Sequence, residues 1–387
     1  MKIVRGCFYF IVITVVTLTA ISAMRGNRSY MDIHNDVKAG IESIFSPLPF
    51  EDFLYEAKYS YFRATNRGHF NGVTFLKDGR LMFDNQKERL FINDRANEIA
   101  FLSSYLNERG TPFLYVRSPN KLQDNSLLPI AFSGSTPISD GNLILELLRE
   151  QGVDTFDLRE QMENEGIDFP SAFFRGDHHW TTETTFWAFG QIADFVNREY
   201  GFSIDEMSWD PQQYETIVIE YGFLGEESKA VNAFHRFEDI TALIPKFPTD
   251  FTVSNIIDSN HKYLVSEGSF AEVFTPRFLD ENITEIDYID LNVVNRHFNR
   301  YENNVAGEKR KILLAMDSMG IPLASFFAVA FETVDNLYIV NIDNNYRIWS
   351  AIDEYDYDLV IFLLSDASAN YEAFNIFELD RFFFGRP

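Results

Sequence analysis

Three short apolar runs in the last part of the chain constrain its fold most strongly. They are Lys311–Met316 (KILLAM), Leu337–Val340 (LYIV) and Leu359–Leu364 (LVIFLL). Between the first two lies an amphipathic stretch, 322–334, which begins with a proline that suits the first turn of a helix. Strands that alternate with helices and are apolar along their whole length are typical of a parallel sheet covered on both faces. The sequence therefore predicts an α/β fold with a three-layer parallel sheet.

The first half of the chain adds a hairpin, a strand and helices to this pattern. Asp78-Gly79 between two apolar runs predicts a hairpin over 71–83, and the run FLYV predicts a buried strand at 113–116. Apolar residues at helical spacing predict helices over 90–106, 140–151 and 181–200. Asp140 is the expected cap of the second of these helices, and Thr181 or Thr182 that of the third. Between about 203 and 310, strand-like pieces alternate with acidic loops, which indicates a β-rich lobe inserted into the α/β core.

The N-terminus has the pattern of a targeting segment. A short basic start (MKIVR) precedes 18 residues without charge, 7–24. This pattern is typical of a signal peptide or a signal anchor. We expect residues 1–24 to form a single membrane span, 25–50 a juxtamembrane stalk, and 51–387 a domain outside the cytoplasm. The domain would be secreted if the chain is cleaved near Ser22, where small residues favour cleavage.

The charge and cysteine content exclude several classes of protein. There are 33 basic and 58 acidic residues, which gives a net charge of −25. A protein that binds nucleic acid needs a basic face to replace the counterions of the phosphates, so no nucleic-acid partner is expected. The single cysteine, Cys7, excludes an intramolecular disulfide and a four-cysteine zinc site.

The candidate acid–base residues lie just before the helix expected at 181–200. In the run Asp177-His178-His179, an aspartate two positions from a histidine can turn toward the same site, orient the imidazole and stabilise its protonated form. The alternative is a purely structural role, in which these residues only cap the helix. A metal site is disfavoured because adjacent histidines normally point apart and no third ligand follows at a suitable spacing. No metal or other cofactor is therefore expected.

A candidate nucleophile follows the apolar strand at 311–316. There the chain reads Asp317-Ser318-Met319-Gly320 and then enters a helix. Functional groups of α/β sheets gather at the carboxyl ends of the strands, and backbone N–H groups at a helix start can stabilise an oxyanion. The amides of Ser318 and Gly320 are the candidates for that role. Aspartate and serine are also ordinary helix caps, so this motif has a purely structural explanation as well.

A wider resemblance joins the two motifs. The stretch Phe174–Glu183 (FRGDHHWTTE) resembles the signature of the bacterial DHHW protein family, which is similar to the SGNH-hydrolase-like domains of the alginate O-acetylation proteins. The hairpin at 71–83, the turn Pro119-Asn120-Lys121 and the pair Asp317-Ser318 follow in the family's order. The resemblance extends over most of 71–365 and implies an SGNH-hydrolase-like fold.

The resemblance also implies roles for individual residues. Ser318 would be the nucleophile, His179 the general base and Asp177 the residue that orients it, while His178 would only pack nearby. The remaining candidates, for the oxyanion or the substrate, are Gly320, Asn120 and Lys121.

The function implied is that of an acyltransferase or carbohydrate esterase acting on O-acyl groups, expected to be O-acetyl, of a cell-envelope polysaccharide. Its partners would be that polysaccharide and an acyl donor, supplied by a membrane-bound acyltransferase. The alternative is a polysaccharide-binding or assembly protein without turnover. Ile321 and Asn345 replace residues that are polar or cationic in the family, which predicts a thinner polar lining of the site.

Overall fold

The structure is a computed structural model whose described residues all lie in the unit formed by residues 62–387. The described ranges are 68–70, 72–83, 92–129, 136–231, 237–258, 261–294, 298–305, 307–339 and 347–368. The expected signal segment at 1–24, the stalk at 25–50 and Asn345 lie outside these ranges and stay predictions.

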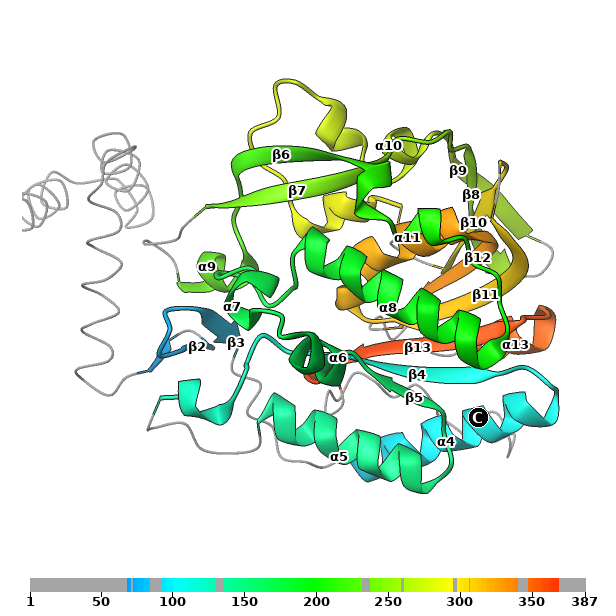
Figure 1. Cartoon of the computed structure of the whole chain (residues 1–387), viewed down its shortest axis with the longest axis horizontal. Helices are drawn as coiled ribbons and strands as arrows, with labels where there is room; N and C mark the ends of the chain where they lie inside the picture. The colour runs from blue at the N-terminus through cyan, green and yellow to red at the C-terminus, as the bar shows by residue number, and fades with distance from the viewer. Residues whose placement is uncertain are drawn as a thin grey trace, which may run out of the picture. The chain divides into compact units, whose positions relative to one another are not determined.

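An eight-stranded sheet forms the centre of the described chain (Figure 1). In spatial order its strands are β5 (Thr155–Asp157), β4 (Phe113–Ser118), β13 (Leu359–Ser365), β11 (Glu308–Met316), β12 (Phe331–Tyr338), β10 (Phe298–Asn303), β8 (Phe251–Asp258) and β9 (His261–Gly268). The first five run parallel, and β10, β8 and β9 continue the sheet antiparallel. The prediction that three C-terminal strands lie side by side is confirmed, but the sheet is mixed and not wholly parallel.

Helices cover both faces of the parallel part of this sheet (Figure 1). One face packs against α6 (Leu158–Glu165), α8 (Thr182–Tyr200) and α11 (Ile321–Ala330), and the other against α4 (Ile92–Glu108), α5 (Pro137–Glu150) and α13 (Arg347–Glu354). Successive residues of β11 divide between the two faces. Ile312 and Leu314 belong to the first core, and Leu313 and Ala315 to the second. Each fully buried aliphatic side chain contributes about 1.5–3 kcal/mol, which is why the buried part of this central strand, residues 312–316, is apolar.

The start of α5 differs from the sequence prediction. The helix begins at Pro137 because Thr136 and Ser139 form a capping box, in which each side chain binds the other residue's backbone N–H. Asp140 therefore lies in the first turn and does not cap the helix. The prediction for α8 is confirmed, since Thr181 caps it through the Thr184 N–H and Gly201, at φ 65°, ends it.

The helix expected at 322–334 ends four residues early. It stops at Ala330, and β12 begins at the next residue, so Val334 lies in a strand and not on a helix. Val334 pairs with Ile312 of β11 on one side and with Tyr301 of β10 on the other. A continuous apolar run satisfies both helical and strand spacing, and here the pairing with two neighbouring strands decides.

The stretch 203–310, expected to be an inserted lobe, contributes to two structures. Its first part forms a two-stranded ribbon, β6 (Tyr214–Phe223) and β7 (Glu238–Pro245), which is held to α8 by a hydrogen bond from Thr182 Oγ1 to the Thr241 carbonyl. Strands β8, β9 and β10 from the same stretch join the central sheet. The short helices α9 (Glu226–Val231), α10 (Phe270–Val273) and the 3₁₀ segment η5 (Tyr288–Asn292) connect them.

A separate three-stranded sheet is formed by residues that precede the central sheet in the sequence. Its strands are β1 (His69–Phe70), β2 (Val73–Phe75) and β3 (Leu81–Phe83). The hairpin expected around Asp78-Gly79 is confirmed: Thr74 pairs with Met82, and Gly79 has the positive φ of 87° that such a turn requires. The remaining short elements are α7 (Phe169–Ala172), η1 (Asn125–Leu127), η2 (Glu206–Ser208), η3 (Pro211–Gln213), η4 (Pro276–Leu279) and η6 (Ser318–Gly320).

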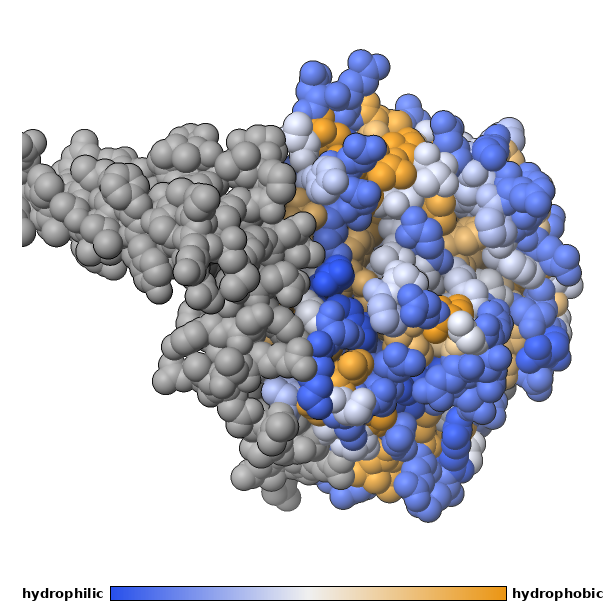
Figure 2. Space-filling model, turned by 60° about the vertical axis from the view of Figure 1, so that its left-hand side comes forward, coloured by the Kyte–Doolittle hydropathy of each residue, from blue (hydrophilic) through white to orange (hydrophobic). Residues whose placement is uncertain are grey.

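The described surface is mostly polar. On the face shown in Figure 2, hydrophilic residues cover most of the area between smaller apolar patches. Within the described ranges, no helix combines the length and the apolar character needed to cross a membrane.

Candidate active site

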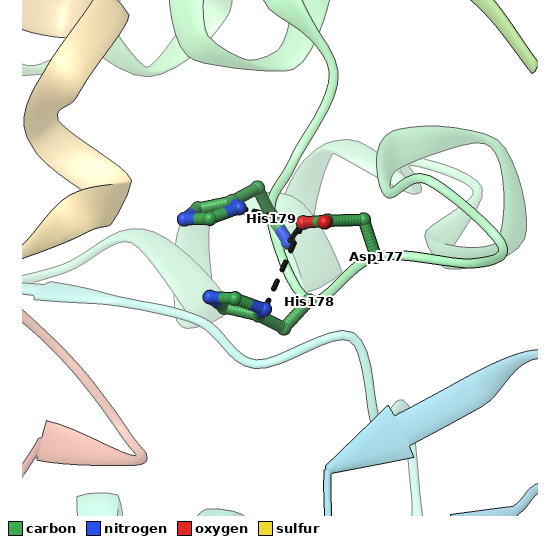
Figure 3. Close-up of side chains that lie close together, drawn as sticks. All are labelled: Asp177, His178 and His179. Carbon is green, nitrogen blue, oxygen red and sulfur yellow. Dashed lines mark hydrogen bonds and ion pairs between the residues drawn. The ribbon is translucent and has the colours of Figure 1, made fainter. Parts of the chain in front are cut away.

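The loop between α7 and α8 presents Asp177 and His179 to one another (Figure 3). Asp177 is buried, and its Oδ1 accepts hydrogen bonds from the backbone N–H of His179 (2.9 Å) and from the ring Nδ1 of His179 (2.6 Å). Its Oδ2 accepts a third from the Glu226 N–H (2.7 Å). Burial alone would raise the pKa of Asp177, but His179, His178 and the Glu226 amide hold that pKa well below its usual range. The carboxylate is therefore ionised and fixed in orientation.

His179 has the form of a general base. Its ring is buried, and the hydrogen bond from Nδ1–H to the ionised Asp177 leaves the lone pair on Nε2. That Nε2 is buried and makes no hydrogen bond within the described part of the chain. Burial lowers the pKa of His179, and the neighbouring His178 lowers it further against the opposing influence of Asp177. The imidazole is thus neutral and able to accept a proton at Nε2.

His178 lies beside His179, contrary to the expectation that adjacent histidines point apart. The two ring centroids are 3.8 Å apart, and both side chains lie on the same side of Asp177 (Figure 3). The loop is bent here, without the alternation of a strand or the rotation of a helix, so neighbouring side chains share one direction. His178 Nδ1 lies 3.5 Å from Glu227 Oε2 and 3.7 Å from Asp177 Oδ1. Burial disfavours the cation, but Glu227 and Asp177 outweigh it and raise the pKa of His178 to about 9.

Tyr288 of η5 covers the ring of His179. The two rings stack with centroids 3.8 Å apart and an angle of 11° between their planes. The phenol is buried, and burial raises the pKa of Tyr288 well above its usual value, so it stays neutral. Sequence reasoning missed Tyr288 and Glu227, because neither lies in a motif and both reach the site only through the tertiary fold.

Lys121, a candidate substrate-binding residue, holds the loop between α7 and α8, which carries Asp177, in place. Its side chain is fully buried, and Nζ donates hydrogen bonds to the carbonyl oxygens of Phe174 (3.1 Å), Arg175 (3.2 Å) and Asp177 (2.5 Å). Three acceptors match the three protons of an ammonium group. Burial lowers the pKa of Lys121, against the influence of Glu227 and Asp177.

Asn120, the neighbouring candidate, lies past the carboxyl end of β4 and is also buried. Its Oδ1 accepts a hydrogen bond from the Leu122 N–H (2.9 Å), and its own N–H donates to Asp366 Oδ2 (3.3 Å). These bonds shape the turn that carries Lys121.

Ser318 lies at the carboxyl end of β11, as the sequence predicts, and is half-buried at the start of η6. Asp317 holds the turn: its Oδ1 accepts from the Met319 N–H, and its Oδ2 accepts from the Ser365 N–H and the Ser368 hydroxyl beyond β13. The Gly320 N–H, a candidate for the oxyanion, donates to the Asp317 carbonyl (3.0 Å). The amide of Ser318 heads the turn, a position at which a helix supplies no internal acceptor.

One hydrogen bond brings the two motifs together. Trp180 Nε1 donates to the Met319 carbonyl oxygen at 3.0 Å, and each of these residues directly follows a candidate catalytic residue. His179 and Ser318 are therefore on adjoining segments. They are not hydrogen-bonded to each other in this structure, since Nε2 of His179 makes no hydrogen bond to any residue in the described ranges. Such contacts are often longer before substrate binds.

Asp177, His178 and His179 also form the group of potential metal donors found in the described ranges, with donor atoms within 4.8 Å of one another. Both carboxylate oxygens of Asp177 already accept N–H groups, and Nδ1 of His179 is one of those donors. The residues are thus arranged as a hydrogen-bonded acid–base pair.

Comparisons with known proteins bear on the fold of the chain. Residues 75–222 match the family described as the SGNH hydrolase-like domain of the acetyltransferase AlgX. Bacillus cereus PatB1, solved with a sulfonyl adduct, is similar in structure, with 18% identity over 79% of this chain and 99% of its own, and a TM-score of 0.61.

Two further solved structures are similar. A DHHW family protein from Eubacterium siraeum has 17% identity over 80% of this chain and 95% of its own, and a TM-score of 0.54. The O-acetyltransferase domain of Pseudomonas putida AlgJ has 13% identity over 78% of this chain and 93% of its own, and a TM-score of 0.48. No curated protein sequence matches significantly. Residues 75–222 therefore resemble the SGNH hydrolase-like domain of AlgX, and the resemblance of the chain to the DHHW family is confirmed at the level of the fold.

Proposed function

We propose that this protein is an exported acyltransferase or esterase in which Ser318, His179 and Asp177 transfer O-acyl groups, acetyl above all, of a cell-envelope polysaccharide. The observation that carries the proposal is the His179 side chain, whose buried Nε2 has no hydrogen-bond partner among the described residues and whose ring Asp177 orients at 2.6 Å. The Trp180–Met319 hydrogen bond holds the Ser318 turn next to this base. A serine hydroxyl is a weak nucleophile, and a positioned base is what activates it.

The first half of the reaction forms an acyl-enzyme. Ser318 Oγ attacks the acyl carbonyl carbon while its proton passes to His179 Nε2. Asp177 stays ionised and stabilises the imidazolium that results. The tetrahedral intermediate then collapses, the bond to the leaving alcohol oxygen breaks, and that oxygen takes the proton from His179. The Ser318 amide, at the head of its turn, is placed to donate a hydrogen bond to the oxyanion.

The second half transfers the acyl group onward. A hydroxyl group of the acceptor loses its proton to His179 Nε2 and attacks the acyl carbon. The bond from this carbon to Ser318 Oγ then breaks, and Oγ takes the proton back from His179. A sugar hydroxyl as the acceptor makes the protein a transferase, and water makes it an esterase. The name of the matching family, which is that of an acetyltransferase, favours acetyl as the group transferred.

The proposed location is the cell membrane, with the domain outside the cytoplasm. The uncharged run at 7–24 behind a basic start supports it. The chain should then sediment with membranes, and external protease should digest the part after residue 30 in intact spheroplasts. Recovery in the soluble cytoplasmic fraction would contradict this location.

The catalytic proposal is tested with a small acetyl ester and a sulfonyl fluoride probe. The parent protein should hydrolyse the ester and become labelled at Ser318. Ser318→Ala should lose both the hydrolysis and the labelling. His179→Ala should lose about as much ester turnover as Ser318→Ala, because triad residues act as a unit. Ser203→Ala, which removes an exposed serine, is the matched control and should behave like the parent. The opposite outcome is a parent protein that is neither labelled nor active, yet binds polysaccharide as well as Ser318→Ala does. The protein would then be a non-catalytic binding protein.

A further inference from the structure

We propose that Glu227 and His178 form a second, charged pair beside Asp177 and His179, and that this pair keeps the His179 imidazole neutral. Both are positioning residues that act through His179. The inference rests on the proposed function only where it calls His179 the base of the reaction.

Glu227 is an unusual residue for the interior of a protein. Its side chain is fully buried, and neither carboxylate oxygen makes a hydrogen bond within the described ranges. The ion pair with His178, 3.5 Å from Oε2, is its closest charged contact there. A buried carboxylate is costly unless a cation compensates it, and His178 and the Lys121 ammonium are the cations that face Glu227.

The helix that carries Glu227 is also the one that binds Asp177. The Glu226 N–H donates to Asp177 Oδ2 at 2.7 Å, and the Ser228 N–H donates to the Gly176 carbonyl at 2.9 Å. Glu227 lies between these two bonded residues, so α9 fixes the orienting aspartate and presents the second carboxylate in one unit. The two acid–histidine pairs are therefore built together.

The close approach of the two histidine rings couples the two pairs. With centroids 3.8 Å apart, two imidazolium ions would repel each other strongly, so a proton on His178 disfavours a proton on His179. The pKa of His178 is raised and that of His179 is lowered, as this coupling requires. Tyr288, neutral, covers the other face of the His179 ring.

Other charged groups near the two rings do not reverse this effect. Asp177 favours the protonated form of both histidines and Glu227 also favours that of His179, whereas the Lys121 ammonium opposes protonation of His178. The nearer charge of His178 outweighs that of Glu227 at the His179 ring. Glu238 of β7 binds the Arg175 and Gly176 amides behind the loop. His178 thus supplies the positive charge that lies closest to the His179 ring. Its effect is to keep the base unprotonated, and the site competent, at lower pH than an ordinary histidine allows.

The test is an NMR titration of histidine rings in the full-length chain, carried out in the Ser318→Ala background so that it does not depend on turnover. In the parent, His178 should titrate above and His179 below the range of a free histidine. His178→Gln should raise the pKa of His179 by about one unit or more, since a like charge within reach shifts a pKa by that amount. Glu227→Gln should lower the pKa of His178. His261→Gln, an exposed histidine on the edge strand β9, is the control and should change neither value.

A further variant separates charge from packing. His178→Lys keeps a cation next to His179 and should keep its pKa low, provided that circular dichroism shows a folded protein. In Ser318-containing enzyme, the acid limb of kcat/KM should move to higher pH in His178→Gln. An unchanged His179 titration in folded His178→Gln would overturn the inference. It would leave the proposed function standing, which the sulfonyl labelling of Ser318 tests separately.

Discussion

The indole N–H of Trp180 and the carbonyl oxygen of Met319 are hydrogen-bonded at 3.0 Å although 139 positions separate them in the chain. Trp180 is fully buried at the start of α8, and Met319 is buried in the turn after the central strand β11. Because each residue directly follows a proposed catalytic residue, this contact ties the segment that carries the proposed base to the segment that carries the proposed nucleophile.

Removal of this hydrogen bond should reduce both turnover and stability. Trp180→Phe keeps a buried aromatic ring but leaves the Met319 carbonyl without this donor, which costs about 1–3 kcal/mol of unfolding free energy. Turnover of an acetyl ester should fall by roughly tenfold to a hundredfold, because a shift of about 1 Å has such effects. Trp187→Phe is the matched control: its Nε1 binds Glu165 at the exposed surface. Equal activities of the two variants would contradict the prediction.

Lys121 should be required for the shape of the loop and not for contact with substrate. Lys121→Met fills a similar volume but leaves three carbonyl oxygens without their donor, and we expect a loss on the order of 3 kcal/mol in urea unfolding together with loss of activity. Lys246→Met removes an exposed lysine that binds one carbonyl and should be neutral. If Lys121→Met folds as stably as the parent and only KM rises, Lys121 is a substrate-binding residue.

Close packing of glycine against the loop gives a third prediction. A Cβ atom on Gly225 would lie 2.2 Å from the Gly176 carbonyl oxygen and 2.5 Å from Asp177 Cβ, so Gly225→Ala must displace the orienting aspartate. We expect ester turnover to fall at least tenfold. In Gly201→Ala the new methyl group meets nothing within 4 Å but strains a backbone at φ 65°. This control should lose about 1 kcal/mol of stability and keep its activity. Comparable activity losses in the two variants would show that stability alone matters.

The charged state of His178 makes a prediction for stability against pH. Its pKa rises from about 6.5 in the unfolded chain to about 9 in the folded one, because Glu227 outweighs burial. A raised folded pKa gives stability that is fully present below pH 6.5 and is lost as the pH rises through about 9. The parent should therefore exceed Glu227→Gln in urea-unfolding free energy at pH 6, and this advantage should shrink by pH 10. A difference that stays constant over this range would contradict the charged pair.

The sequence predicted those features that depend on neighbours along the chain. Asp177 and His179 are two positions apart, so their pairing follows from local geometry, and Ser318 follows from the rule that links function to strand ends. The strand status of Val334 could not be predicted, because an apolar run fits helix and strand equally until β10 and β11 bind it. Glu227 and Tyr288 give no local signal at all, since only packing brings α9 and η5 to the histidines.

The spatial order of the strands bears on how the protein is made. Strand β13, the last of the described chain, lies between β4 and β11, so neither of these earlier strands has its inner neighbour until residues 359–365 have been synthesised. A nascent chain emerges from the N-terminus, and an unpaired strand edge is prone to wrong associations. Residues 177–179 and Ser318 are thus both translated before the strand that joins β4 to β11. The open edges of these two strands therefore depend on protection until residue 365 has been made.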